Sequence, residues 1–410
     1  MRTYGELFRT PEFAPLFATV SVQVAAGTVS QLALGTLVYA ATGSPLLSAL
    51  SMFGPSFAQV IGAAALLSAA DRLPPRAALA GLALAFGTGT AVLAVPGLPV
   101  AAVFGVILVL GLVASLGGGV RYGLLSEILA ADGYVLGRSV LNMSVGTMQI
   151  CGFAVGGLLV TVLSPRGTLL AGAGLYLATA IVARLGLSAR PPRATGRPSI
   201  ARTWRTNAAL WSSAARRYVY LALWVPNGLI VGCESIFVPY APHQAGLLFA
   251  FAAFGMLIGD TLAGRFIPGG WRARLGPPLR LLLAAPYLIF ALHPAPPVAI
   301  AAVTVASIGY AASLLLQERL ISLTPDDMQG QALGLHSSGM LTWQGIGAAG
   351  AGALAQHTSP ATAMAVMAAL SITVTLALAP GLRPAERAGR ARPWDVRPLA
   401  DEPPPGSELT

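Results

Sequence analysis

The sequence contains no lysine, so all of its 25 basic residues are arginine. Without lysine the chain cannot form a P-loop for ATP, a pyridoxal or retinal Schiff base, or a lysine nucleophile. Composition therefore excludes an intrinsic ATP-driven pump. Charge is scarce as well, at 10% of the 410 residues, and no Ser/His/Asp set, metal-ligand cluster or H-E-x-x-H spacing occurs. We expect neither an enzyme nor a cofactor or metal site.

Cysteine is almost absent. The chain has two, Cys151 and Cys233, and both fall in apolar runs. We expect small buried thiols here rather than a structural disulfide.

Long hydrophobic runs, in contrast, are abundant. Hydrophobic residues make up 55% of the chain, and its mean hydropathy is +0.71. A helix needs about 20 apolar residues to cross a bilayer, because its backbone groups must satisfy one another in lipid. The sequence therefore predicts an all-α integral membrane protein with twelve transmembrane helices. They are expected near 13–40, 46–69, 77–95, 98–125, 138–163, 167–187, 218–239, 245–267, 276–292, 297–320, 331–356 and 360–380.

The arginines are distributed very unevenly among the connections. The odd-numbered connections hold a single one, Arg166, while the others lie at the termini, in even-numbered connections or at adjoining helix ends. Because basic loops stay on the cytoplasmic side, both termini are predicted to be cytoplasmic. We expect a multi-pass protein of the bacterial inner membrane. The net charge of +10 is then explained by contact with the inner leaflet, and nucleic-acid binding is not expected.

The longest connection divides the chain into two halves of six spans each. The tail after the last span is rich in proline and polar residues, which predicts disorder. The expected units are a first six-helix bundle (1–187), a cytoplasmic linker (188–217), a second six-helix bundle (218–380) and the tail (381–410).

Within the linker, aromatic and basic residues fall on opposite sides of a helix. This pattern predicts an interfacial helix on the inner leaflet, the alternative being a flexible linker. The two sides consist of Ile200, Trp204 and Trp211, and of Arg202, Arg205 and Arg216.

The two halves match when the chain is shifted by 193 residues. A constant offset at separated points predicts two pseudo-symmetric six-helix bundles with a shared central cavity. The matched pairs are Gly62 with Gly255, Asp71-Arg72 with Gly264-Arg265, Gly152 with Gly345, and Gly157 with Gly350.

The connection after the second span carries the stretch "SAADRLPPRAAL". It resembles the G-x-x-x-D-[RK]-x-G-[RK]-[RK] signature of the major facilitator superfamily, with Asp71, Arg72 and Arg76 at the charged positions. Leu67, Pro74 and Pro75 depart from the pattern, and the copy in the second half keeps Arg265. The resemblance implies a cytoplasmic gate formed by these four charged residues. The alternative is that the arginines only set the topology.

A second stretch, "CGFAVGGLL" in the fifth span, is similar to the G-P-x-x-G-G element of the antiporter branch of that family. Gly152, Gly156 and Gly157 match, and Phe153 stands where proline is expected. The resemblance implies a drug/proton antiporter of twelve helices that works by alternating access. Close helix packing is the alternative explanation for these glycines.

Ionisable residues inside the bilayer are functional candidates, because a charge there is costly. Glu234 in the seventh span is our candidate proton carrier, the alternative being that it reaches toward the outer surface. Asp260 in the eighth span is a second coupling candidate, or a gate residue near Arg265. Arg121 in the fourth span is expected to pair with Glu127 or another acid.

Neutral polar residues complete the expected cavity. Each is equally compatible with a hydrogen bond between helices. The cavity candidates are Gln31, Arg121, Asn142, Asn227 and Trp343.

These features favour a secondary active transporter that exports a lipophilic or weakly basic small organic molecule in exchange for protons. A sparsely charged cavity suits such a substrate better than a sugar phosphate or a dicarboxylate. The alternatives are uptake of a neutral nutrient and a non-transporting membrane sensor or scaffold with the same fold. We expect the protein to act as a monomer in the bilayer.

Overall fold

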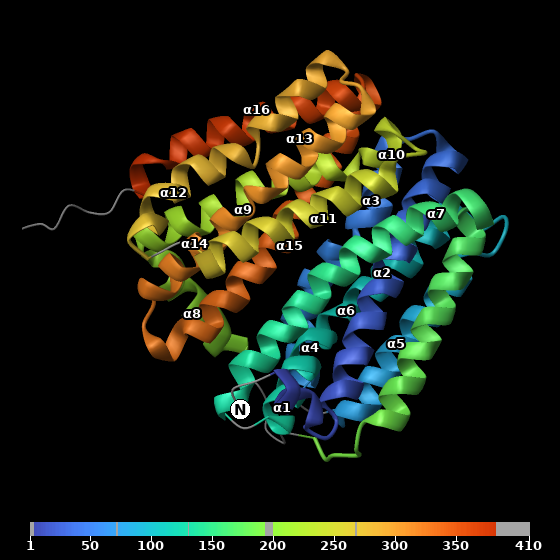
Figure 1. Cartoon of the computed structure of the whole chain (residues 1–410), viewed down its shortest axis with the longest axis vertical. Helices are drawn as coiled ribbons and strands as arrows, with labels where there is room; N and C mark the ends of the chain where they lie inside the picture. Colours follow the sequence, from blue (N-terminus) through green and yellow to red (C-terminus); the bar gives the residue numbers. More distant parts are fainter. Residues whose placement is uncertain (1–3, 71–72, 130, 193–199, 267–268, 383–410) are drawn as a thin grey trace, which may run out of the picture.

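In the computed structural model, residues 4–70, 73–129, 131–192, 200–266 and 269–382 are described. Every regular element within these ranges is a helix (Figure 1), as expected for apolar segments whose backbone must bond internally in lipid. Ten helical ranges are long and apolar enough to cross a membrane. One of them, Leu136–Gly186, contains two crossings, and a further long helix with more polar residues completes the predicted set of twelve spans.

The first bundle, coloured blue to green in Figure 1, contains spans one to six. Its fifth and sixth spans form one long element that turns at Ser164, where φ is 70°, just before Pro165. A short helix, α1 (Tyr4–Arg9), precedes the bundle. The spanning elements are α2 (Phe13–Thr42), α3 (Pro45–Phe53) with α4 (Pro55–Ala70), α5 (Pro75–Leu93), α6 (Val100–Ile128) and α7 (Ala131–Gly186).

The second bundle, coloured green-yellow to red, contains spans seven to twelve. Four of its spans are divided into two elements, whereas α15 and α16 each cross as one uninterrupted helix. The elements are α9 (Ala214–Ser235), α10 (Phe237–Tyr240), α11 (Ala245–Thr261), η1 (Leu262–Phe266), α12 (Gly269–Leu282), η2 (Ala285–Leu292), α13 (Pro296–Ile308), α14 (Ala311–Ser322), η3 (Asp326–Met328), α15 (Gln329–His357), α16 (Pro360–Leu378) and η4 (Pro380–Leu382).

Equivalent glycines make equivalent contacts in the two bundles. A Cβ on Gly62 of α4 would lie 2.7 Å from the Ser115 hydroxyl of α6. A Cβ on Gly255 of α11 would lie 2.8 Å from the Ser307 Cβ of α13. The second and fourth spans therefore pack as the eighth and tenth do, each pair closing on a small residue. The internal repeat read from the sequence corresponds to repeated packing.

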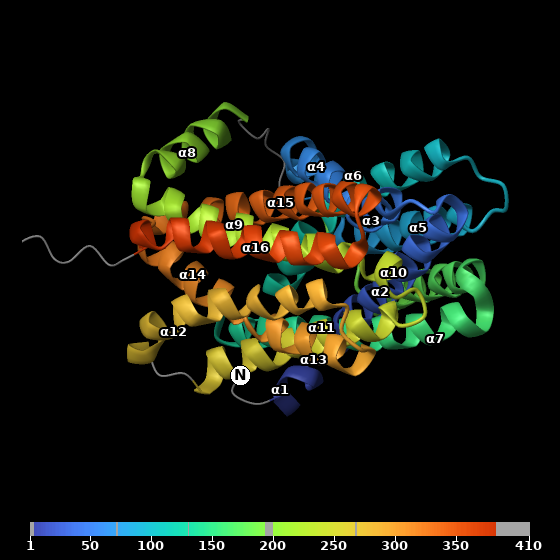
Figure 2. The same cartoon turned by 90° about the horizontal axis from the view of Figure 1, so that it is seen from above.

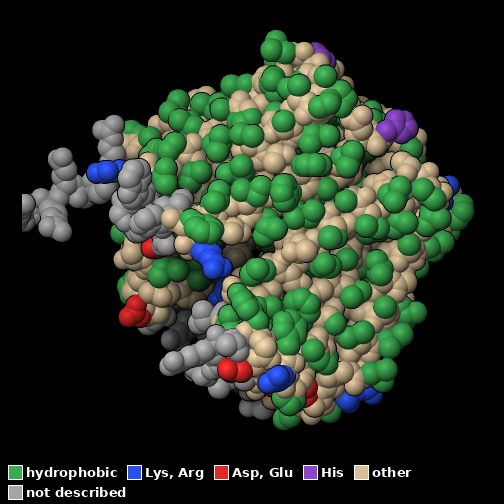
Figure 3. Space-filling model, viewed as in Figure 1, with side chains coloured by type: hydrophobic (Ala, Val, Ile, Leu, Met, Phe, Trp, Pro, Cys, Tyr) green, Lys and Arg blue, Asp and Glu red, His purple; other side chains and the backbone are tan. Residues whose placement is uncertain are grey.

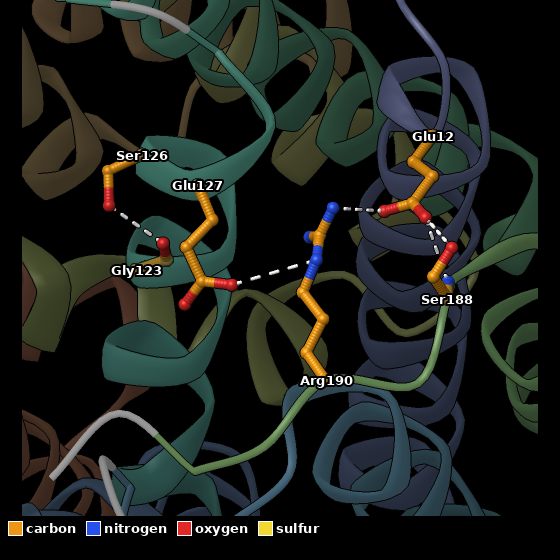
Figure 4. A network of polar contacts seen from close by, with 6 residues as sticks. All are labelled: Glu12, Gly123, Ser126, Glu127, Ser188 and Arg190. Carbon is orange, nitrogen blue, oxygen red and sulfur yellow. Dashed lines mark hydrogen bonds and ion pairs between the residues drawn. The ribbon is translucent and has the colours of Figure 1, made fainter.

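The connection between the bundles begins with a polar network, shown in Figure 4. Glu12, at the start of α2, lies 2.9 Å from the Arg190 guanidinium and accepts a hydrogen bond from the Ser188 backbone amide at 3.0 Å. Arg190 also reaches Glu127 at the end of α6, at 3.8 Å. These contacts attach the chain leaving α7 to the ends of two other spans of the first bundle.

Further along the connection, α8 (Ile200–Ser212) lies outside both bundles (Figure 2). Trp204 is 69% exposed, but Trp211 stacks on Trp224 of α9, with ring centroids 5.6 Å apart. The prediction that Arg216 belongs to the basic face of this helix is wrong. Ser213 has an extended backbone and ends α8, so Arg216 lies in α9, where it donates to the carbonyl groups of Leu210 and Leu323.

The cysteines differ in burial. Cys233 is fully buried in the second bundle, whereas Cys151 on α7 is exposed, contrary to the expectation of a buried thiol. An apolar side chain on the outer surface of a membrane bundle meets lipid, so apolar sequence alone does not distinguish core from surface.

Candidate functional site

A cavity of about 430 Å³ lies between the two bundles. Both halves line it, and most of its wall comes from the second bundle. The first bundle contributes residues of α2, α3, α4 and α7, and the second those of α9, α11, α14 and α15. The polar lining residues are Gln31, Ser56, Gln149, Asn227, Glu234, Asp260, Tyr310, Ser313, Gln317 and Gln344.

The cavity is built where helices are interrupted. Glu234 is the penultimate residue of α9, just before the chain leaves helical geometry at Ile236. Tyr310 lies between α13 and α14, and Phe53 is the last residue of α3, next to Gly54. A broken helix frees backbone groups and re-aims side chains, which is tolerated in a membrane where it lines a cavity. The local backbone thus directs these three side chains toward the interior.

Glu234 is held by one specific hydrogen bond. The Tyr310 hydroxyl donates to its Oε1 at 3.1 Å, which joins the seventh span to the tenth. Both residues line the cavity. A carboxylate that accepts a hydrogen bond from a buried hydroxyl is fixed in orientation without being neutralised, so it stays available to a proton or a cationic ligand.

Asp260 is the second carboxyl of the cavity, on α11. Its alternative role, as a gate residue near Arg265, stays a prediction, and no ion pair joins these two side chains among the described residues. The chain passes into the π-helical turn η1 at Leu262, which changes the spacing that a continuous α-helix would give between Asp260 and Arg265. Asp260 lines the same space as Glu234.

The charge of the described lining is entirely negative. Glu234 and Asp260 both come from the second bundle, and the described lining residues of the first bundle include no ionisable side chain. No arginine faces either carboxyl among them. In a space partly shielded from water, two acids without a basic partner favour a cation or protons over an anion.

The apolar part of the wall is adaptable. Phe153 of α7 stacks on Phe249 of α11 across the interface between the bundles, with ring centroids 4.7 Å apart. Phe153 is the residue that replaces proline in the glycine-rich element. Methionines 52, 256 and 340 also line the cavity, and their flexible thioether side chains fit ligands of varied shape.

Two of the neutral cavity candidates lie in this wall. The Gln31 amide donates to the Met52 carbonyl group at 3.0 Å, and Asn227 accepts from the Gln344 amide at 3.4 Å. Each therefore combines a helix-to-helix hydrogen bond with exposure to the cavity. The two interpretations made from the sequence are not exclusive for these side chains.

The other three cavity candidates are not among the residues that line this space. Trp343 packs with Trp224 in a cluster beside α9. Asn142 accepts a hydrogen bond from the Tyr122 hydroxyl at 3.1 Å. Arg121 covers the Tyr122 ring at 4.7 Å and donates to its hydroxyl. The contacts of Arg121 among the described residues are to Tyr122, and its expected pairing with Glu127 or another acid stays a prediction.

The predicted gate is only partly described. Asp71 and Arg72 lie outside the described residues. Arg76 is half-buried in the first turn of α5, and Arg265 is exposed in η1. The gate role of the four residues stays a prediction.

The three glycines of the fifth span mark two different contacts. Gly152 and Gly156 pack against Thr28 and Val29 of α2, inside the first bundle. A Cβ on Gly157 would instead lie 3.0 Å from the Gly246 Cα of α11, in the second bundle. Gly157 therefore allows a backbone-to-backbone approach between the halves.

The contact between Gly157 and Gly246 lies at an end of the molecule where the two bundles touch. Near it, Ser44 before α3 donates to Gln356 of α15 at 2.8 Å, and Gly352 of α15 packs against Leu46. All of these contacts join the bundles at the end with the odd-numbered connections. Figure 3 shows the surface hollowed between the bundles toward the opposite end, where α8 and α14 lie. The cavity is accordingly closed at one end only.

Sequence analysis missed Tyr310, Ser313 and Gln317, which bring the tenth span into the cavity. The available signal was the Gly309-Tyr310 pair inside an apolar run. A Cβ on Gly309 would lie 2.6 Å from the Leu283 Cα, so a close backbone approach coincides with the helix break. Hydropathy does not reveal this helix break, because one glycine and one tyrosine change the mean hydropathy of an apolar run very little.

No protein-family model and no curated protein matches the chain. Solved structures do match at low sequence identity. A POT family transporter in complex with a thioalcohol-conjugated peptide aligns with a TM-score of 0.73 and 11% identity, over 91% of this chain and 96% of that one. The nucleoside transporter NupG aligns with a TM-score of 0.73 and 14% identity, over 91% and 99%.

A third match is a bacterial homologue of the human lysosomal transporter Spinster in an inward-facing, unoccupied conformation. Its TM-score is 0.65 at 12% identity, covering 91% of this chain and 93% of that one. These neighbours are transporters rather than enzymes, and identities this low relate the chain to them by fold. The described residues form an all-helical multi-pass membrane protein with twelve spans in two pseudo-symmetric bundles, the major facilitator fold.

Proposed function

We propose that this protein is a secondary active transporter that exports a lipophilic, weakly basic small molecule in exchange for protons. The observation that carries the proposal is the cavity between the bundles, which has two carboxyls, no facing arginine among its described residues and a wall of methionine and phenylalanine. Such a wall provides apolar contact for the body of a molecule and two negative groups for its basic nitrogen.

Exchange of substrate for protons would follow if both bind to the same two carboxyl groups. A proton and an organic cation each stabilise a carboxylate that lines the cavity, so binding of one favours release of the other. The fixed position of Glu234 on Tyr310 makes it the main proton carrier, and Asp260 supplies the second acidic group. Alternating access would then be rocking of the unit 1–187 against the unit 218–380 around the cavity.

The described arginines near α1, α8 and α14 support a cytoplasmic orientation of the open end. On this orientation the structure represents an inward-facing state, ready to take substrate from the cytoplasm or the inner leaflet. The proposed location is the bacterial inner membrane, with the protein acting as a monomer.

The test is transport by the purified protein reconstituted in liposomes, with a pH gradient imposed across the membrane. The probes are ethidium and tetraphenylphosphonium as lipophilic cations, with uridine as a neutral nutrient. We expect movement of a cation against the proton gradient. Glu234→Gln should abolish the dependence on the gradient, whereas Glu6→Gln, on the short helix α1 outside the cavity, should retain it.

Uptake of a neutral nutrient is the competing function, and the same assay separates it. Uridine movement without cation movement, or cation movement that Glu234→Gln leaves coupled, would overturn the export proposal. A protein that moves none of the probes under any gradient would instead favour the sensor or scaffold alternative.

A further inference from the structure

A second cavity, of about 390 Å³, lies inside the first bundle rather than between the bundles. It is lined by residues of α2, α3, α4, α5, α6 and α7. Interiors of helical bundles are normally close-packed, whereas this space is partly open, so a ligand group can enter it. It is separate from the proton-coupling residues, since neither Glu234 nor Asp260 lines it.

Its described wall is uncharged and includes two aromatic rings. Phe86 of α5 and Tyr176 of α7 stack with ring centroids 5.5 Å apart and planes 20° apart, and both line the space. Gly27 and Gly87 leave the room that Tyr176 occupies, because a Cβ on either would lie within 3.3 Å of that side chain. No Asp, Glu, Arg or His is among the described residues of this wall.

The wall also holds buried hydroxyl groups. Ser30 is 8% exposed, and its hydroxyl has no hydrogen-bond partner among the described residues. Thr90 is 4% exposed and lines the same space. Buried polar groups are usually paired, and an unpaired one beside a cavity indicates a group that a ligand can satisfy.

The two cavities share a boundary. Gln31, Met52 and Ser56 line both, and the hydrogen bond from Gln31 to the Met52 carbonyl group fixes part of this wall. Met52 is flexible and unbranched, so its side chain can move aside without breaking the helix around it. An elongated molecule could therefore reach from one cavity into the other.

We propose that the cavity inside the first bundle is a second binding subsite, which takes an aromatic group of an elongated amphiphilic substrate. The inference rests on the proposed function, because the basic end of the same molecule occupies the central cavity near Glu234 and Asp260. The uncharged end passes Met52 and lies beside the Phe86 and Tyr176 rings.

The experiment is calorimetric titration of the full-length protein in detergent with three matched compounds. Hexylamine carries the basic end alone, 6-phenylhexylamine adds the ring, and 6-phenylhexan-1-ol keeps the ring without the charge. Micelles without protein correct for partitioning. Burial of the ring should make 6-phenylhexylamine bind roughly tenfold more tightly than hexylamine.

Two variants assign this gain to the subsite. Ala114→Leu projects from α6 into the space and should remove the gain, leaving hexylamine binding within about twofold. Ala101→Leu makes the same change at an exposed position of α6 that lines neither cavity, and it should keep the gain. Should Ala114→Leu fail to fold, Phe86→Leu tests the same wall, because it removes a ring beside the proposed position of the phenyl group and should lower the affinity for 6-phenylhexylamine without changing that for hexylamine.

The outcomes separate the two ideas. Equal affinity for both amines, or a ring gain that persists in Ala114→Leu, overturns the subsite. If both amines bind and Glu234→Gln weakens both, the proposed function stands without it. Failure of either amine to bind, together with no movement of cations across liposomes, rejects the proposed function itself.

Discussion

The two bundles share a packing scheme but not a chemistry. Gly62 with Ser115 and Gly255 with Ser307 make the same kind of contact in the two halves. The carboxyls of the central cavity, however, both come from the second bundle, and the additional cavity lies in the first. Residues at close helix contacts must stay small, because the two backbones approach each other there. Residues that line a cavity are not under this constraint, so they can differ between the halves. The second bundle therefore contributes both carboxyls of the central cavity, and the first bundle contains the additional cavity.

The contact between the halves gives the largest expected effect. Ser44→Cys with Gln356→Cys, in a background with Cys151→Ser and Cys233→Ala, should be joined by a short bis-methanethiosulfonate cross-linker, since the native side chains meet at 2.8 Å between Ser44 Oγ and the far end of Gln356. The proposed alternating-access mechanism requires this end to open, so cross-linking should stop liposome transport of ethidium completely.

Reductant cleaves the cross-link and should restore transport in the double-cysteine protein, and each single-cysteine variant should keep transport after the same treatment. A cross-linked protein that still transports at the full rate would show that the halves do not separate here.

The equivalent packing of the two halves can be tested by replacing one closely packed glycine in each half with alanine. Gly62→Ala and Gly255→Ala should each lower stability by roughly 1–3 kcal/mol, because the added methyl meets atoms less than 3 Å away. Thermal unfolding in detergent, followed by tryptophan fluorescence, measures the loss.

Gly105→Ala in the first bundle and Gly264→Ala in the second are the matched controls, since nothing lies within 4 Å of a Cβ at either position. Removing glycine from a helix should leave these variants as stable as the parent or slightly more so. A marked loss at only one of Gly62 and Gly255 would break the equivalence between the halves.

The chemical difference between the halves can be tested at a single hydrogen bond in the second bundle, where we expect a smaller effect. Tyr310→Phe removes the hydrogen bond to Glu234 but keeps the ring, and a bond to an ionised group contributes about 1.5–3 kcal/mol. Proton-coupled transport at a fixed gradient should fall by roughly tenfold or more without loss of folded protein.

Tyr240→Phe provides the comparison, because its hydroxyl makes a long 3.4 Å contact to the Pro294 carbonyl group and does not line the cavity. Equal transport by Tyr310→Phe and Tyr240→Phe would mean that Glu234 needs no positioning partner.

Sequence patterns predicted the scaffold well and the site partly. The twelve spans followed from apolar length alone, since a bilayer imposes the same requirement on each helix. Glu234 and Asp260 stood out because charge is rare in such runs. Tyr310 did not, and neither did the contact between Arg121 and the Tyr122 ring. A stretch of apolar sequence does not show which aromatic side chain faces a cation, because that depends on how separate spans are rotated.

By itself, the sequence determined the number of crossings, the internal repeat and the short list of intramembrane acids, because each of these depends on hydrophobicity or identity along the chain. Only the tertiary structure decided that both acids face one cavity, that Phe153 stacks on Phe249 across the halves, and that the first bundle contains a second space. Those features arise from helix breaks and glycine contacts that set the rotation and approach of spans distant in the chain, and no local pattern encodes them.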